Sequence, residues 1–195
     1  MSEDLETLKQ DEGVSLAMNP KKFLVWLFIV SIVMIFGSLT SAYIVRQAEG
    51  NWKVFEMPAI FLYSTFVLLA SSVTIHVAYL AAKKQDVNKN RLFLGFSLLL
   101  ALAFLYMQLL GWKELTKSGV FFSFGNPSES FLYVLTGLHA FHLLTGIIFI
   151  IIVLISSSKQ LVPSKRLLQN EMCATYWHFL DGLWLYLYLF LMFNR

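Results

Sequence analysis

Five ionisable side chains lie inside long apolar stretches of this chain, where a charge is costly. Four are histidines and one is an aspartate: His76, His139, His142, His178 and Asp181. An ionisable group in the middle of a bilayer costs about 2.5–3.5 kcal/mol on insertion scales, so such groups usually mark a site or a helix interface. Imidazole and carboxylate groups are also common metal ligands. We therefore ask first whether these residues could form a metal centre.

Their spacing fits few metal centres. A b-type cytochrome with two haems places histidine pairs at different depths of its helices, but His139 and His142 are three residues apart on one segment. A di-iron bundle requires Glu-x-x-His repeats on facing helices, and the chain has none. A zinc site of three histidines remains conceivable. The simpler interpretation is that these residues satisfy one another between packed helices. Cys173 is the single cysteine, which excludes an intrachain disulfide and a multi-cysteine metal site.

The elements that must position these residues are membrane helices. Of the 195 residues, 57% are hydrophobic and 14% are charged, whereas a soluble domain has about 25% charged residues. Five apolar segments cover residues 23–46, 57–82, 91–111, 130–156 and 171–193. Each is long enough to cross a bilayer, which takes roughly 20 helical residues. The sequence predicts an all-α integral membrane bundle, with one five-helix domain over 23–195 after a cytoplasmic segment, 1–22.

The distribution of charge predicts the orientation. Segment 1–22 lacks a basic n-region and a cleavage site, so we expect the first helix to be retained. With the N-terminus in the cytoplasm, ten of the 15 Lys and Arg residues fall on the cytoplasmic side, as the positive-inside rule requires. Five crossings then place the C-terminus in the periplasm of a bacterial inner membrane. The net charge of +3 gives little support to nucleic acid, and we expect no such partner.

Depth in the membrane predicts a polar contact between the last two segments. They run antiparallel, and His142 and Asp181 lie within a residue of the midpoints of 130–156 and 171–193. At about 1.5 Å per residue, the two side chains lie at nearly the same depth. We predict that Asp181 pairs with a histidine of segment 130–156 or with His178, because an unpaired carboxylate in lipid is costly.

Other polar residues have more than one interpretation. His76 follows Ser71-Ser-Val-Thr74, and hydroxyl residues let helices approach and bond to one another. The ring is therefore expected in a helix contact or at a lipid headgroup. Gly37 and Ser41 form a small-xxx-small pair with the same packing meaning. Glu171 lies near the cytoplasmic interface and is expected to meet a lipid headgroup or a basic partner residue, or to be solvated.

Together these segments resemble subunit III of the haem-copper terminal oxidases, from Lys22 onward. The run Thr136-Gly-Leu-His-Ala-Phe-His-Leu-Leu-Thr-Gly146 is similar to the family's T-G-x-H-x-x-H-x-x-x-G. The run Glu171-Met-Cys-Ala-Thr-Tyr-Trp-His-Phe-Leu-Asp-Gly-Leu-Trp184 resembles its E-x(5)-W-H-F-x-D-x-x-W signature. Leu68-Leu-Ala-Ser-Ser-Val-Thr-Ile-His-Val-Ala78 and Gln108 also match family positions. The resemblance is to the five-helix form, whose topology is N-in and C-out.

The resemblance implies that haem and copper lie in the neighbouring subunit I and that this chain carries no cofactor or catalytic centre. It implies direct contact with subunit I, association with subunit II and other respiratory-complex subunits, and phospholipid bound in a cleft. The chain would sustain proton uptake and stability in an enzyme that reduces oxygen and pumps protons. The residues expected to form the polar seam or a lipid site are His76, Gln108, His139, His142, Glu171, Trp177, His178 and Asp181.

Two positions depart from the family pattern. Ile32 occupies the place of a family glutamate, so no role of that carboxylate carries over. After Gln108 the family's Q-x-x-E becomes Gln108-Leu-Leu-Gly111, and Glu114 comes three residues later. That shift moves the acid nearly one turn toward water.

Three alternatives remain open beside a cytochrome c oxidase subunit III. They are a quinol oxidase subunit III, an accessory subunit of a nitric oxide reductase, and a small transporter. Paired broken helices would favour the transporter, but all four prolines, at 20, 58, 127 and 163, fall at segment ends. The electron donor is open, and cytochrome c is expected because it is the more frequent donor.

Overall fold

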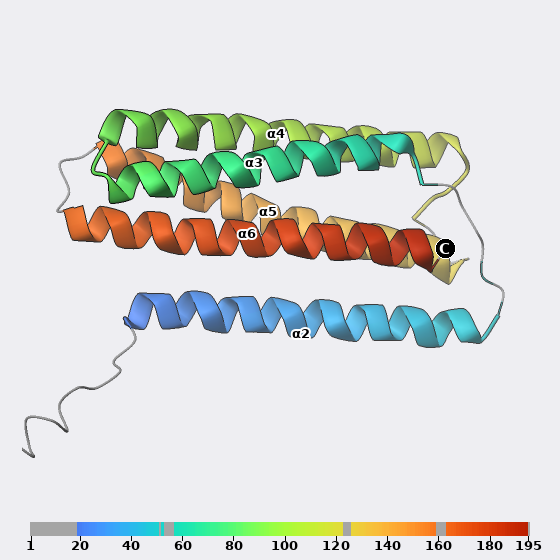
Figure 1. Cartoon of the computed structure of the whole chain (residues 1–195). Helices are drawn as coiled ribbons and strands as arrows, with labels where there is room; N and C mark the ends of the chain where they lie inside the picture. The colour runs from blue at the N-terminus through green and yellow to red at the C-terminus, as the bar shows by residue number, and fades with distance from the viewer. Residues whose placement is uncertain (1–18, 51, 53–56, 123–125, 159–162, 195) are drawn as a thin grey trace, which may run out of the picture.

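A computed structural model describes residues 19–50, 52, 57–122, 126–158 and 163–194, and every regular element in these ranges is a helix. The five helices are α2 (Pro20–Ala48), α3 (Ala59–Lys83), α4 (Val87–Lys117), α5 (Pro127–Ser158) and α6 (Pro163–Phe193). Successive helices run in opposite directions (Figure 1). The predicted all-α class is confirmed. Most of the predicted cytoplasmic segment, residues 1–18, lies outside the described residues.

Four of the predicted membrane crossings are supported by length and composition. Within the described residues, α2, α3, α4 and α5 are long and apolar enough to span a bilayer. Helix α6 has 31 residues, which is sufficient length, but it does not meet the same standard of hydropathy. His178, Asp181 and several Tyr and Trp residues lower the hydropathy of its apolar stretch. Two candidate site residues are thus among the side chains that lower the hydropathy of α6.

The helices extend beyond the apolar segments from which they were predicted. Helix α6 begins at Pro163 rather than at residue 171, and α4 ends at Lys117 rather than at residue 111. A helix can continue into the polar interface because its hydrogen bonds are internal. Proline sets three of the starts, since its fixed φ suits the first helical position. At the start of α2, Asn19 Oδ1 also accepts a bond of 3.1 Å from Lys21 N.

A very short turn joins α3 and α4 and keeps them side by side. Only Lys84, Gln85 and Asp86 separate the two helices, and Gln85 has a φ of 60°. The Asp86 carboxylate caps α4 by accepting from Lys89 N at 3.1 Å. That backbone bond holds the pKa of Asp86 below its usual range. Asp86 is therefore charged at neutral pH, as the N-terminus of a helix prefers.

The five helices form a ring of four with one helix outside it. Helices α3, α4, α5 and α6 each pack on two others of the ring, whereas α2 packs only on α5 and α6. In Figure 1, α2 runs beside α6 on the side away from α3. The centre of the ring is filled by large side chains, and Trp177 and Trp184 are both at most 1% exposed. Some candidate residues of α5 and α6, such as Trp177, thus lie in the ring, and others, such as His142, face the outer helix.

Candidate functional site

Hydroxyl side chains of α3 bind the tryptophans of α6. The Trp177 indole N–H donates to Ser71 Oγ at 2.9 Å, and the Trp184 indole N–H donates to Thr65 Oγ1 at 2.9 Å. All four side chains are buried. An indole N–H buried in an apolar core needs an acceptor. These two bonds therefore fix the rotation of α6 about its own axis and its position along α3.

The same α3 face also reaches α4. Gln108 Nε2 donates to Ser64 Oγ at 3.0 Å, and the hydroxyls of Thr74 and Ser97 are 2.7 Å apart. Gln108 lies inside α4, nine residues before its last residue, and is 2% exposed. We call Ser64, Thr65, Ser71, Ser72 and Thr74 the hydroxyl row. Sequence analysis missed its first two members, which their spacing from Ser71 could have revealed.

The outermost member of the hydroxyl row meets a histidine. Ser72 Oγ lies 2.6 Å from His178 Nδ1. The His178 ring is 5.7 Å from the ring of His76, centroid to centroid. His76 is exposed, and His178 is half-buried. The structure therefore brings His76 and His178 together on the outer side of the contact between helices α3 and α6.

The two histidines of α5 point toward different helices. His139 is fully buried, and its Nε2 donates to the Leu180 carbonyl of α6 at 3.2 Å. His142 donates from Nδ1 to the Leu138 carbonyl of its own helix at 2.8 Å. Its ring lies 6.3 Å from that of Phe28 and 5.8 Å from that of Phe36, both on α2. One histidine thus joins α5 to α6, and the other forms the surface that receives α2.

Asp181 does not make the contact that its depth predicts. It is 4% exposed, and neither carboxylate oxygen has a hydrogen-bond partner among the described residues. The Ser72 hydroxyl is in its neighbourhood but bonds to His178. The predicted pairing with a histidine is therefore wrong for the described chain. Depth fixes a position along the helix axis, but it does not fix the direction in which a side chain points.

The ionisable residues consequently do not gather into one cluster, although His76 and His178 lie side by side. In the part of the chain that the structure describes, no group of three or more His, Cys, Asp or Glu side chains could hold a metal ion. The three-histidine zinc site that the sequence left conceivable is not assembled there.

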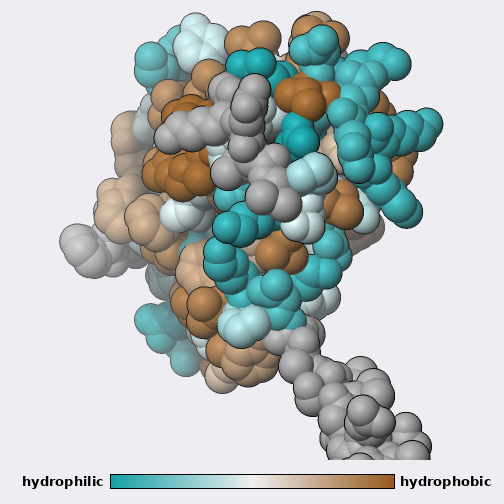
Figure 2. Space-filling model, turned by 90° about the vertical axis from the view of Figure 1, so that its left-hand side faces the viewer, coloured by the Kyte–Doolittle hydropathy of each residue, from teal (hydrophilic) through white to brown (hydrophobic). Residues whose placement is uncertain are grey.

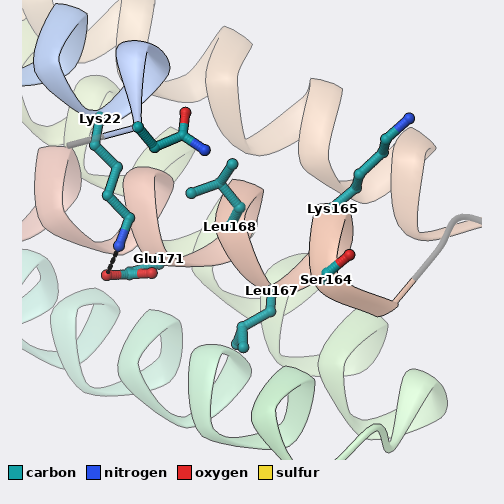
Figure 3. Close-up of a pocket in the computed structure, with 7 residues that line it drawn as sticks. Lys22, Ser164, Lys165, Leu167, Leu168 and Glu171 are labelled. Atoms are coloured by element: carbon teal, nitrogen blue, oxygen red, sulfur yellow. Dashed lines mark hydrogen bonds and ion pairs between the residues drawn. The ribbon is translucent and has the colours of Figure 1, made fainter. Parts of the chain in front are cut away.

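An ion pair and a pocket lie at the end of the molecule where α2 and α6 begin. Lys22 Nζ is 2.6 Å from Glu171 Oε1, and the two side chains are 34% and 39% exposed. Figure 3 shows Lys22 pointing at Glu171, with Leu167 and Leu168 beside the pair. They line a pocket of about 560 Å³. Hydrophilic side chains gather across this end of the molecule, seen face-on in Figure 2. The basic residue expected for Glu171 thus comes from the chain itself.

A second buried polar cluster was not predicted from the sequence. Asn90 Nδ2 donates to Asn170 Oδ1 at 2.7 Å and to the Ala78 carbonyl at 2.8 Å. Ser157 Oγ donates to Asn90 Oδ1 at 2.9 Å. This cluster ties α3, α4, α5 and α6 together at one end. Asparagines at the ends of apolar runs are usually solvated, so the sequence carried no clear signal of it.

Comparison with known proteins identifies the family. The model of a family described as cytochrome c oxidase subunit III matches residues 9–194. The chain belongs to the cytochrome c oxidase subunit III family. A cytochrome c oxidase subunit 3 from Bacillus sp. strain PS3 is 29% identical over 84% of this chain and 80% of its own length. A probable quinol oxidase subunit 3 from Staphylococcus saprophyticus is 28% identical over 96% of this chain and 94% of its own length.

This membership confirms the resemblance drawn from the histidine-bearing runs. The chain is a subunit III of a haem-copper oxidase, and it is a bacterial membrane protein with multiple apolar helices. Respiratory electron transport follows from the family. The subunit III family has no metal site of its own, and relatives carry both cytochrome c and quinol oxidase names. The predicted residues are therefore residues of an oxidase subunit III.

Proposed function

We propose that this chain is the non-catalytic subunit III of a bacterial cytochrome c oxidase and packs directly on the haem- and copper-bearing subunit I. Subunit II and other respiratory-complex subunits complete the assembly. The observation that carries this proposal is the family match over residues 9–194. All five helices cross the inner membrane in this proposal, with the N-terminus in the cytoplasm and the C-terminus in the periplasm.

The support given to subunit I is mechanical in this proposal. His139 and Trp177 use their ring N–H groups to fix α6 within the ring of four helices. Such polar contacts hold helices together in a bilayer, where the hydrophobic effect between them is absent. The resulting rigid surface limits the motion of subunit I during turnover. The polar end around Lys22 and Glu171 faces the cytoplasm, from which protons are taken up.

Phospholipid binding belongs to the same proposal. An apolar pocket of about 320 Å³ lies between α2 and α5. Its lining includes Leu24 and Ile148. Such a lining suits acyl chains, and Lys22 lies at the polar end of the same helix. Lipid would fill the space that side chains leave between α2 and α5.

The electron donor separates two versions of the function. We infer cytochrome c as the donor, and the Staphylococcus relative favours quinol as the alternative. Donor sites lie in other subunits, so residues of this chain do not decide between the two. Oxygen consumption by membranes supplied with reduced cytochrome c or with a quinol would distinguish them.

Deletion of this chain tests the proposed function. We expect oxygen consumption by the membranes to fall, and activity to decline faster during turnover, while the haem content of subunit I stays nearly unchanged. Complementation with the wild-type chain should restore the turnover lifetime. Unchanged oxygen consumption and unchanged turnover lifetime after deletion would reject the proposal.

A further inference from the structure

One side of α6 presents three polar residues and a glycine outward. Glu171, Thr175, His178 and Gly182 follow one another at spacings of four, three and four, which places them on one helical face. Gly182 is exposed and the other three are half-buried. Exposed His76 of α3 lies beside this row, with its ring 5.7 Å from that of His178. We call these five residues the outer α6 face.

Lipid does not satisfy this surface. Among the described residues, His178 bonds Ser72 through Nδ1, and no hydrogen bond reaches His178 Nε2 or the ring of His76. Acyl chains offer neither donors nor acceptors. Exposed imidazoles among apolar helices therefore indicate a protein neighbour rather than a lipid one. Asp181, one turn along α6, adds a buried carboxylate with both oxygens unpartnered.

The shape of the surface suits a second helix. Gly182 lines the groove of about 430 Å³ between α6 and α2, together with Gly37 and His178. A Cβ added at Gly182 or Gly37 would meet nothing within 4 Å, so neither glycine is needed for packing within this chain. Small residues at a membrane interface let the backbone of another helix approach closely. The glycines leave room for a partner beside the unsatisfied imidazoles.

We propose that the outer α6 face docks a transmembrane helix of the haem-bearing subunit, which presents hydrogen-bonding side chains to His76 and His178 and packs closely on Gly182. This proposal rests on the proposed function and names the surface by which that function is carried out. The ion pair of Lys22 with Glu171 marks the polar end of the docking surface. The apolar second half of α6, from Leu185 to Leu189, continues it toward the other end.

Photo-crosslinking in the intact complex tests the location. A benzophenone amino acid replaces Gly182, and in a matched control it replaces Gly137, where an added Cβ also meets nothing within 4 Å. Gly137 lines a pocket between α4 and α5. We expect a crosslink from position 182 to a haem-bearing subunit, at least tenfold stronger than from position 137. Crosslinks from position 182 only to lipid or to a second copy of this chain would overturn the proposal, as would equal crosslinking from both positions.

Subunit retention tests the chemistry. His76→Leu and Gly182→Leu should each lower the amount of haem-bearing subunit that copurifies with this chain by at least fivefold. His76→Gln, which restores a donor and an acceptor, should recover most of it, and Gly137→Leu should leave retention unchanged. The abundance of the chain alone should not fall for His76→Leu, because leucine suits lipid better than imidazole does. Wild-type retention in both leucine variants would overturn the docking surface.

The outcomes separate this inference from the proposed function. If the wild-type chain copurifies with no haem-bearing subunit, the proposed function itself fails. If it copurifies normally but position 182 makes no crosslink to that subunit, only the docking surface fails.

Discussion

The ring of helices α3, α4, α5 and α6 and the outer helix α2 are both apolar, but different contacts hold them in place. Within the ring, side chains bond across helices in the membrane interior, as Trp177 does to Ser71. Most polar bonds of α2 to the ring lie near its two ends: Lys22 meets Glu171, and Tyr43 and Gln47 donate to the Asn194 carbonyl at 2.9 Å.

The middle of α2 instead lies against apolar pockets and aromatic side chains. Only 22% of its most apolar stretch is buried, against 39% for α5. Helices in lipid associate through close packing and hydrogen bonds rather than through the hydrophobic effect. The ring is therefore held by bonds within the membrane interior, and α2 is held mainly by bonds near its two ends.

The largest expected difference comes from filling a glycine in each part. A Cβ at Gly146 would lie 3.0 Å from Leu180 Cδ1 and 3.1 Å from Trp177 Cζ3. Gly146→Leu should therefore lower the free energy of unfolding by about 1–3 kcal/mol through overpacking. Gly37→Leu on α2 is the control, because a Cβ there meets nothing within 4 Å. Thermal unfolding of the two variants in detergent would measure the difference, and equal losses would contradict the comparison.

Removing one hydroxyl from each part should give the next largest difference. Ser71→Ala leaves the buried indole N–H of Trp177 without its acceptor, so we expect the free energy of unfolding to fall by about 1 kcal/mol. Ser38→Ala on α2 removes only a bond to the Ile35 carbonyl of the same helix, and it should have almost no effect. Denaturant titration of both variants compares them directly. A neutral Ser71→Ala would show that the hydroxyl row does not hold the ring together.

A double-mutant cycle tests how α2 meets the ring. Ile32 is fully buried and lies one turn from both Phe28 and Phe36, which flank the ring of His142. A glutamate introduced at Ile32 should therefore reach His142. We expect Ile32→Glu to lower the free energy of unfolding by about 0.6 kcal/mol less when His142 is present than in a His142→Leu background. That difference is the average contribution of a hydrogen bond between membrane helices. Additive effects would show that position 32 does not face His142.

The smallest expected effect concerns the ion pair at the start of α2. Lys22 and Glu171 are each more than a third exposed, so solvent screens their attraction. Lys22→Gln should lower stability by less than about 0.5 kcal/mol, and the loss should shrink as salt is raised. The exchanged pair, Lys22→Glu with Glu171→Lys, should recover the stability in the same unfolding assay. A loss that salt does not change would indicate that the pocket, rather than the charge pair, was disturbed.

The sequence predicted the number and the centres of the helices because each contains a long apolar run. It did not predict their ends, since α6 begins eight residues before the run, at Pro163, and this added part contains several polar residues. The predicted polar residues do make contacts between helices, but their partners were not foreseen. His139 bonds a backbone carbonyl and Asp181 bonds no described residue. Helix rotation in the packed bundle decides such partners, and neither depth nor spacing reports it.

The central claim is that the redox chemistry lies in a neighbouring subunit. The most direct measurement is the visible absorbance spectrum of the tagged chain, purified from its native membranes first in complex and then after mild dissociation in detergent. The account predicts haem absorbance in the complex, and after separation it predicts haem only in the fraction without this chain. Haem that stays with the separated chain, or a chain that purifies with no haem-bearing subunit, would contradict it.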